Sequence, residues 1–356
     1  MGDCPIHHAR GELALLRQMP DFESRTGDWL PFDRALARIL SHVSALPPET
    51  VPLEEALGRA LALDVLAPGP LPPWDNSAMD GYAVRGDDVV GATKDQPVVL
   101  VVTGVIHAGS RFEGTVGPGD AVRIMTGAEV PGDADTVIRV EDTDREETES
   151  GNLRIYSERD RGRHVRPAGQ DWPEGAVTLE SGTGIGPGQA AVLAASRVSS
   201  VSVHHRPKVA ILASGDELVD IESQALDPHG IPESNSHLVS AGVRAAGGIP
   251  MRLGIARDDR ADIQHHLARA ADADVLVTLG GASMGEGDLF KTVLEDLGFE
   301  LDFWRVKIRP GSPMSFGRLP LEGGGSQMVF GLPGNPASAF VTFELFVRPL
   351  DRKSTR

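Results

Sequence analysis

The sequence predicts a multidomain α/β plus β protein: an open α/β domain, and a discontinuous elongated domain into which a small β domain is inserted. Three observations carry this prediction. The 356 residues are more than one ordinary hydrophobic core accommodates. Residues 205–350 alternate short apolar runs with helical patterns, which is typical of an open α/β sheet. Residues 82–167 contain short apolar runs separated by Gly, Pro, Asp and Asn, as small all-β domains do.

Changes of composition set the predicted domain boundaries. The start of the chain has mixed charge and no sustained hydrophobic period, so it is expected to be an extension. A Gly-rich and then apolar stretch is expected to return to the first helical region, which makes the β segment an insertion. The predicted parts are an extension at 1–27, an elongated domain at 28–81 and 168–204, a β domain at 82–167, an α/β domain at 205–350, and a tail at 351–356.

Periodicity and turn residues predict the elements of the first half. Apolar residues at helical spacing from Phe32 to Val43 predict a helix, which Pro47 and Pro48 end. Residues 53–63 predict a second short helix. The remaining predicted elements are a Pro-rich connector at 64–75 and strands at 98–106, 121–125, 136–140 and 153–156.

The second half alternates strands and helices. Ser234 stands where an N-cap would begin a helix, and Gly247 with Gly248 would end it. The predicted strands are 209–213, 251–255, 275–279, 301–308 and 327–330, and the predicted helices are 234–246, 261–271, 289–297 and 337–346. Such alternation predicts helices on both faces of the sheet.

Charge and cysteine content exclude several classes of protein. The chain has 34 Lys and Arg against 51 Asp and Glu, a net charge of −17, which argues against a nucleic-acid partner but not against a small anionic ligand. Cys4 is the single cysteine, so disulfides within the chain are excluded, and a reducing cytoplasm is expected. No run of eighteen apolar residues indicates a membrane span, and residues 1–10 do not resemble a signal peptide.

Ligands of open α/β sheets bind beyond the carboxyl ends of the strands, where four unusual loops are predicted. One of them, at 280–288, is Gly-rich and leads into a helix, which suits an oxyanion; a simple tight turn is the alternative. The other three loops are 214–217, 257–259 and 331–336.

Acidic residues in these loops predict a cation site. Glu217, Asp258 and Asp288 would meet on one rim, where their carboxylates repel one another. Bound Mg²⁺, which prefers oxygen ligands, would relieve that repulsion. Helix capping by Asp258 and Asp288 is the alternative interpretation.

Basic residues predict an anion site close by. Arg305, Lys307 and Arg309 alternate along the strand predicted at 301–308 and just beyond it, so they are expected to share a face, with Ser312 following. Three cations on one face suit phosphate or molybdate, and a solvated strand face is the alternative.

Seven motifs in order resemble the molybdopterin molybdenumtransferase family, the group of bacterial MoeA and the gephyrin E domain. The resemblance covers residues from about 28 to 350. The motifs are DNSAMDGYAVR at 75–85, RIMTGAEVP at 123–131, SGDEL at 214–218, RDD at 257–259, GGASMGEGD at 280–288, RPGSPMSFG at 309–317 and GLPGNPASA at 331–339.

This resemblance implies a molybdopterin-binding-like α/β domain and a homodimer whose site lies between one subunit's α/β domain and its partner's first domains. It implies that molybdate is inserted at the dithiolene of adenylylated molybdopterin, with release of AMP and assistance from Mg²⁺. The implied catalytic residues are Asp80, Glu217, Asp258 and Asp288, of which the last three would bind the cation. The implied substrate-binding residues are Thr126, Asp171, Gly281, Ser283, Arg305, Arg309, Pro333 and Pro336.

Two departures from the family pattern bear on activity. Arg305, Arg309 and Ser312 stand where the family usually has lysines, and arginine binds with a different geometry. The family usually continues into a further β domain, which this chain, ending at Arg356, is expected to lack. A non-catalytic relative that stores or delivers the cofactor is therefore the alternative function.

The resemblance leaves other choices open. A receptor-clustering scaffold like gephyrin is disfavoured, because no peptide groove is indicated. Expected partners besides the second subunit are the molybdopterin adenylyltransferase and molybdoenzymes or their chaperones. Tungstate and molybdate are not distinguished.

Overall fold

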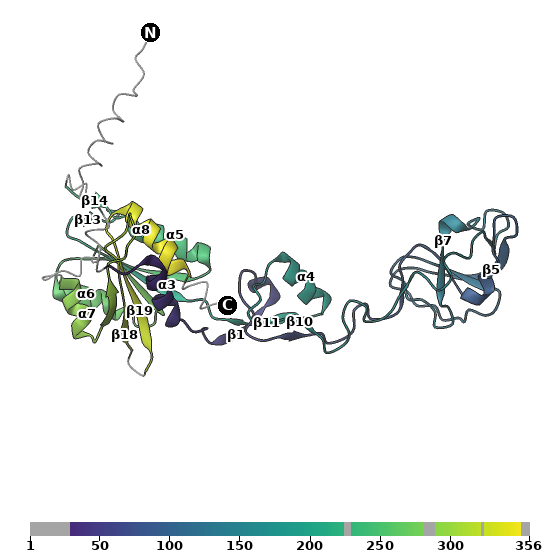
Figure 1. Ribbon diagram of the computed structural model, residues 1–356, viewed down its shortest axis with the longest axis horizontal. Helices are drawn as coiled ribbons and strands as arrows, with labels where there is room; N and C mark the ends of the chain where they lie inside the picture. Colours follow the sequence, from purple (N-terminus) through teal and green to yellow (C-terminus); the bar gives the residue numbers. More distant parts are fainter. Residues whose placement is uncertain (1–28, 224–228, 281–288, 322–323, 350–356) are drawn as a thin grey trace, which may run out of the picture. The chain divides into compact units, whose positions relative to one another are not determined.

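The computed structural model describes residues 29–223, 229–280, 289–321 and 324–349 (Figure 1). The chain forms two compact units. The first, here called the α/β unit, holds residues 1–50, 58–62 and 202–356. The second, here called the β-rich unit, holds residues 51–57 and 63–201.

A six-stranded sheet organises the α/β unit. Its strand order is β15-β12-β16-β19-β18-β17; the first four strands run parallel, and β18 and β17 are antiparallel to their neighbours. The bounds are β15 (Ile249–Ala256), β12 (Lys208–Ser214), β16 (Val275–Leu279), β19 (Ser326–Leu332), β18 (Ser315–Pro320) and β17 (Glu300–Trp304). The predicted open α/β sheet is confirmed, although the sequence pattern does not predict β18.

Helices cover both faces of this sheet, as predicted. Side chains of β12 alternate between two cores: Val209 and Ile211 pack toward one face, and Ala210 and Leu212 toward the other. The first core includes residues of α3 (Phe32–Ser41), α5 (Asn235–Ala246), α8 (Pro336–Thr342) and the π-helical turn η4 (Phe343–Val347). The second includes residues of α6 (Arg260–Ala268) and α7 (Leu289–Asp296).

Helix α3 corrects one predicted boundary. The sequence places it in the elongated domain at 28–81, but Ala35 and Ile39 are fully buried in the same core as β12 and α8. Its apolar stripe therefore closes the sheet of the α/β unit. The other domain boundaries stay predictions.

Two of the predicted elements are wrong in detail. The helix expected at 53–63 is a strand end followed by a single 3-10 turn, η1 (Leu53–Glu55), and Gly58 has a φ of 77° that a helix does not allow. The strand expected at 301–308 ends at Trp304, because Arg305 has a φ of 72° and turns the chain.

A five-stranded sheet forms the centre of the β-rich unit. Its order is β7-β4-β6-β5-β8, and both faces are buried: Tyr82 and Val84 belong to one core and Ala83 to the other. The bounds are β7 (Thr136–Arg139), β4 (Gly81–Val84), β6 (Asp120–Ile124), β5 (Val98–Ile106) and β8 (Asn152–Ile155). This sheet lies within the range predicted for the β domain.

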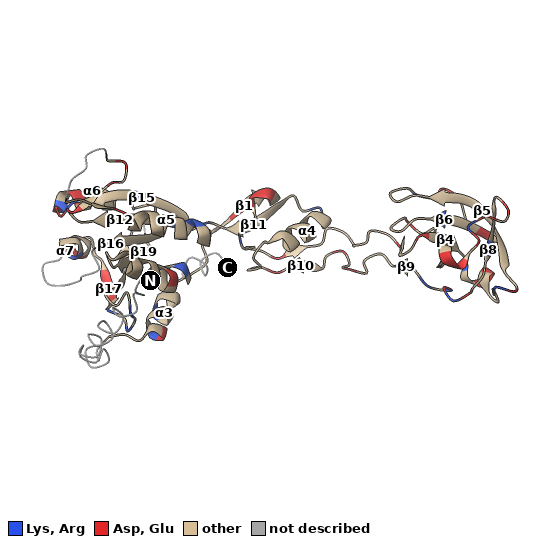
Figure 2. Cartoon of the chain, turned by 90° about the horizontal axis from the view of Figure 1, so that it is seen from above, with Lys and Arg blue, Asp and Glu red and all other residues tan. Residues whose placement is uncertain are grey.

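In the described residues, four pairs of short strands lie outside the two large sheets. The pairs are β3 (Asn76–Ser77) with β9 (Val165–Arg166), β2 (Val65–Leu66) with β10 (Val177–Leu179), β1 (Pro48–Pro52) with β11 (Ser200–His204), and β13 (Leu218–Val219) with β14 (Ile231–Pro232). Helix α4 (Pro187–Ala195) lies in the β-rich unit and carries no charged residue (Figure 2). No helix in the described part of the chain is long and apolar enough to span a membrane.

Candidate functional site

The strands after which the sequence predicts four loops end at one edge of the α/β sheet; residues 281–288 of the third loop lie outside the described residues. The four parallel strands end in register, with Ser214 opposite Ala256 and Leu279 opposite Leu332. The predicted loops that follow these strands therefore leave the same edge, where ligands of open α/β sheets bind.

A cavity of about 250 Å³ opens at this edge. Gly280 forms part of its wall with a φ of 101°, and a Cβ there would lie 2.6 Å from the carbonyl oxygen of Ser214. Only glycine fits so close to the neighbouring strand end. The polar and turn residues of the lining are Ser214, Glu217, Glu233, Ser234, Asn235 and Pro336, and no Lys or Arg of the described residues belongs to it.

Asn235 joins two sides of this cavity, although the sequence does not single it out. Its side-chain nitrogen donates a hydrogen bond to the carbonyl oxygen of Gly334 at 2.7 Å, which ties the start of α5 to the loop after β19. Ser234 occupies the N-cap position, as predicted, but its side chain makes no capping bond. Glu233 takes that role by accepting from the backbone N–H of Ser236 at 2.8 Å.

The predicted acidic residues are only partly placed. Glu217 lines the cavity, and Asp258 follows β15, where its backbone N–H donates to Asp216 at 3.3 Å. The N-cap of α6 is Asp259, which accepts from Asp262, so the capping alternative for Asp258 is wrong. Gly281, Ser283 and Asp288 lie outside the described residues.

The predicted basic strand face does not exist. Arg305 lies in the turn between β17 and β18, and Val306 beside it is fully buried and bridges to Leu30. The Arg305 guanidinium carbon lies 4.0 Å from the ring centroid of Trp304 and 5.5 Å from that of Trp29, a stacked arrangement that holds the cation against two indoles.

The turn that carries Arg305 and Arg309 nevertheless lies at the edge of the sheet where the parallel strands end. Ser315 at the start of β18 pairs with Gly331 near the end of β19, so the turn at 305–314 leaves the sheet at the edge of the cavity loops. Arg309 is exposed in this turn, and Gly311 packs against α8, where a Cβ added to it would lie 3.4 Å from the carbonyl oxygen of Ser338. Pro333 is buried, and Pro336 begins α8.

Asp80 and Thr126 form a pair in the β-rich unit. One carboxylate oxygen of Asp80 accepts from the Thr126 backbone N–H at 2.7 Å and from its hydroxyl at 2.8 Å. The backbone hydrogen bond, and then the hydroxyl one, lower the pKa of the exposed Asp80 carboxyl below its ordinary value. Asp80 is therefore an anion at neutral pH and serves as an acceptor. Asp171, also exposed, donates from its backbone N–H to Leu71 at 2.9 Å in the same unit.

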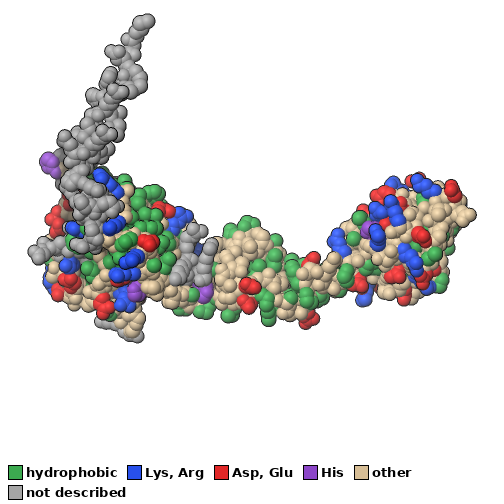
Figure 3. Space-filling view, viewed as in Figure 1, with side chains coloured by type: hydrophobic (Ala, Val, Ile, Leu, Met, Phe, Trp, Pro, Cys, Tyr) green, Lys and Arg blue, Asp and Glu red, His purple; other side chains and the backbone are tan. Residues whose placement is uncertain are grey.

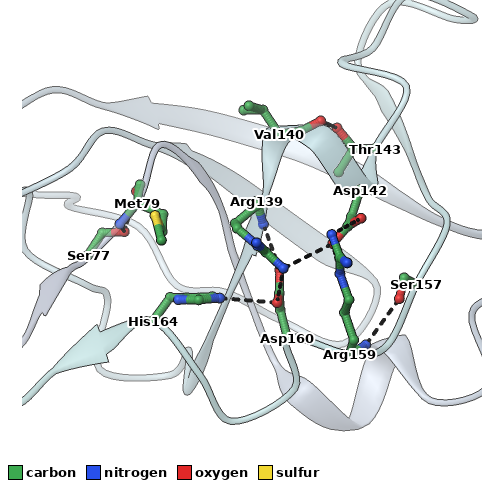
Figure 4. A network of polar contacts seen from close by, with 10 residues as sticks. All are labelled: Ser77, Met79, Arg139, Val140, Asp142, Thr143, Ser157, Arg159, Asp160 and His164. Atoms are coloured by element: carbon green, nitrogen blue, oxygen red, sulfur yellow. Dashed lines mark hydrogen bonds and ion pairs between the residues drawn. The ribbon is translucent and has the colours of Figure 1, made fainter.

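A buried carboxylate, Asp160, holds a network of polar contacts in the same unit (Figure 4). Asp160 is 1% exposed and accepts from Arg139 at 3.0 Å through each of two guanidinium nitrogens, and it contacts His164 Nε2 at 3.1 Å. Burial works to raise the pKa of Asp160, but the hydrogen bonds from Arg139 and His164 outweigh it and hold the pKa below its usual value. The sequence does not reveal this network, because its members have no recognisable spacing.

The lowered pKa predicts how stability depends on pH. A depressed carboxyl pKa stabilises the fold above the unfolded-state value near 3.8 and ceases to do so as pH falls through the folded-state value. Asp160→Asn is therefore expected to lower the free energy of unfolding by about 1.5–3 kcal/mol at pH 7. The difference from wild type should narrow below pH ~4. Urea unfolding followed by circular dichroism at pH 7, 5 and 3.5 checks this, and a constant difference would contradict it.

Two family models match successive parts of the chain. Residues 30–196 match the family described as MoeA N-terminal region (domain I and II), and residues 210–353 match the probable molybdopterin binding domain. The molybdopterin molybdenumtransferase of Nostoc sp. is 39% identical over 306 residues, which are 86% of this chain and 69% of that protein. That of Bacillus subtilis is 36% identical over 326 residues, which are 90% of this chain and 74% of that protein.

Solved structures agree. Two crystal structures of the molybdopterin biosynthesis MoeA protein from Pyrococcus horikoshii match with TM-scores of 0.78 and 0.79 at 35% and 29% identity. Each match covers 92% of this chain and 80% of that one. The resemblance carried by the seven motifs is thus confirmed. This chain belongs to the molybdopterin molybdenumtransferase family.

Proposed function

We propose that this chain is a transferase of molybdenum cofactor biosynthesis, which inserts molybdate into adenylylated molybdopterin and releases AMP. The observation that carries the proposal is the sheet edge where the cavity, the glycines at 280 and 334 and the arginine-bearing turn at 305–309 occur together. Curated relatives with the family name, 36% and 39% identical to this chain, support the reaction.

The charge of each candidate residue indicates which part of the substrates it would contact. Arg305 and Arg309 suit the oxyanions of the substrates, because guanidinium groups hold phosphate-like groups through paired hydrogen bonds. Among the described residues, the cavity of about 250 Å³ is lined by Glu217 and Glu233 and by no cation, so it suits a hydrogen-bonding, ring-bearing end of the pterin substrate better than a phosphate. Asp80, which its hydrogen bonds to Thr126 keep ionised and which is exposed, provides a fixed negative charge and hydrogen-bond acceptor toward the substrate.

The reaction is tested by mixing the purified chain with adenylylated molybdopterin, magnesium and molybdate, and measuring AMP release. Turnover that requires molybdate supports the enzyme. Substrate binding without AMP release would favour the alternative function, a non-catalytic relative that stores or delivers the cofactor. Running tungstate in parallel shows which oxyanion the chain prefers. The cytoplasm is the proposed location, since the single cysteine fits a reducing compartment.

Magnesium is proposed as the assisting cation. In the described part of the chain, no three Asp, Glu, His or Cys side chains are grouped closely enough to hold a metal ion. The described residues therefore do not form a complete metal site, and the roles given to the arginines and to Asp80 do not depend on the ion. Glu217 at the cavity, with Asp258 in the neighbouring loop, supports a cation held by oxygen ligands.

Glu217→Gln is expected to lower AMP release about tenfold at limiting magnesium and to recover at higher magnesium, because a neutral amide is a weaker ligand than a carboxylate. The melting temperature should stay unchanged, since Glu217 is exposed. Magnesium titrations of both proteins measure this, with Glu222→Gln, another exposed acid nearby, as the control. A loss of activity that tracks a loss of stability would instead assign Glu217 a structural role.

A homodimer is proposed as the active form, with each site shared between subunits. An apolar surface of the β-rich unit supports it: Leu66 and Val177 are paired across β2 and β10, and 57% and 50% of their surfaces are exposed. Helix α4 adds an uncharged, alanine-rich surface, and Figure 3 shows hydrophobic side chains gathered over this segment. Apolar surface of this kind is typically covered in an assembly.

Light scattering is therefore expected to give twice the chain mass of 37.8 kDa. Val177→Asp should shift the protein toward monomer, because a charge would be buried in the interface. Val99→Asp is the matched control, since Val99 is 52% exposed on β5 of the same unit. A wild-type monomer at micromolar concentration, or equal effects of the two variants, would count against this interface.

A further inference from the structure

The loop that carries Asp80 is held from two sides. On one side, the backbone N–H of Ala78 donates to the carbonyl oxygen of His164 at 2.8 Å. On the other, the backbone N–H of Val140, just after β7, donates to the carbonyl oxygen of Asp80 at 3.4 Å. The position of the Asp80 carboxylate therefore depends on where His164 and the end of β7 stand.

Asp160 binds both of these supports. Its carboxylate accepts from the guanidinium of Arg139, the last residue of β7, and from the Arg139 backbone N–H at 3.3 Å. The same carboxylate contacts the ring of His164 at 3.1 Å. Figure 4 shows Arg139 and His164 converging on Asp160, with Ser77 and Met79 of the loop beside His164.

His164 connects the buried carboxylate to the loop. Its φ of 65° lies in the left-handed region that non-glycine residues seldom adopt. In this conformation its ring meets Asp160 while its carbonyl oxygen meets Ala78. One residue thus links the buried charge to the segment two positions before Asp80.

We propose that Asp160 is a positioning residue, which acts through Arg139 and His164 to fix the Asp80–Thr126 pair in its working place. The proposal deepens the proposed function and rests on it only where Asp80 takes part in turnover. Asp160 itself is buried and does not reach the substrate. A purely structural carboxylate would stabilise the whole sheet without acting on this loop in particular.

Hydrogen–deuterium exchange tests the structural step without any activity assay. In Asp160→Asn and His164→Gly, exchange of peptides containing Ala78 and Thr126 should rise about tenfold more than exchange of β5 and β8 peptides, which should rise only as far as the lower free energy of unfolding requires. His164→Gly permits the left-handed backbone and removes the ring contact, and Asp160→Asn removes the charge without changing the backbone at 164, so the two variants are compared. Asp144→Asn is the matched control, because Asp144 accepts from the backbone of Arg154 in β8 at 2.8 Å and does not touch the loop's supports.

Kinetics tests the consequence. Asp160→Asn and His164→Gly should lower kcat for AMP release roughly 10–100-fold with a smaller change in KM, because a misplaced catalytic group slows the reaction more than binding. In an Asp80→Ala background, Asp160→Asn should cause no further loss, whereas independent effects would multiply. Asp144→Asn should keep the wild-type kcat.

The outcomes separate the two proposals. A larger rise of exchange in the loop than in the sheet supports positioning even if the chain releases no AMP, in which case only the proposed function fails. An equal rise of exchange in the loop and the sheet, or multiplied losses in the double variant, would show that Asp160 is merely structural and overturn the inference. Unchanged exchange in both Asp160→Asn and His164→Gly would overturn it as well.

Discussion

Replacing Asp80 with asparagine is expected to lower kcat for AMP release about 100-fold, the scale for losing a fixed electrostatic interaction with the reacting substrate. The melting temperature should hardly change, because Asp80 is exposed and its side chain has Thr126 as its partner in the described structure. Asparagine keeps an oxygen that accepts from Thr126 but removes the negative charge. The variant therefore isolates the charge from the loop geometry.

Two variants of Thr126 complete this test. Thr126→Val removes the hydroxyl donor but keeps the backbone N–H, so the pKa of Asp80 should rise toward its usual value and kcat should fall less than in Asp80→Asn. Thr126→Ser keeps both donors and should retain nearly full activity. Steady-state assays across pH measure both effects. An Asp80→Asn enzyme with wild-type kcat would remove Asp80 from the reaction.

The α/β sheet could be predicted because its signals are local. Buried parallel strands are short apolar runs, and Gly247, with a φ of 110°, marks a helix end by residue type alone. Carboxyl ends of parallel strands meet at one edge by topology, so the placement of the cavity loops followed once the strands were found.

Other elements were predicted wrongly from the sequence pattern, because contacts between residues far apart in the chain determine them. Leucines at 53, 57 and 61 mimic helical spacing, but the chain turns at Gly58, and Arg59 reaches back to Glu49 and to the carbonyl oxygen of His204. The alternation from Leu301 continues through Val306, which hides the turn at Arg305.

The hydrogen-bond network around Asp160 could not be predicted from the sequence either. Arg139 at the end of β7 precedes Asp160 by 21 positions, His164 follows it by 4, and neither belongs to a motif. Only the folded backbone shows that these residues share one carboxylate. Asp80 and Thr126, by contrast, were selected through motifs at 75–85 and 123–131, and the structure brings them into hydrogen-bond contact.

Arg309→Ala is expected to weaken binding of molybdate or adenylylated molybdopterin roughly 10–150-fold, which corresponds to about 1.5–3 kcal/mol for hydrogen bonds to a charged group. The reason differs from the strand face that the sequence indicated. Arg309 lies in the turn at the ligand edge of the sheet, and Gly311 seats that turn against α8. Arg305 is stacked on Trp304 and Trp29, whereas Arg309 is exposed in the turn.

Calorimetric measurement of anion affinity in three variants distinguishes a direct contact by Arg309 from the effect of the overall charge of the turn. Lys307→Ala removes the same charge from the same turn and is expected to change affinity much less than Arg309→Ala, since Lys307 is not among the proposed ligands. Ser312→Lys, which restores the family's residue, should bind equally or more tightly if the added cation outweighs the hydrogen bond from the Ser312 hydroxyl to the carbonyl oxygen of Ile308 at 2.5 Å. If Arg309→Ala and Lys307→Ala lower the affinity equally, the turn acts only through its overall positive charge and does not contact the anion. The glycine-lined edge of the sheet would then be the anion site.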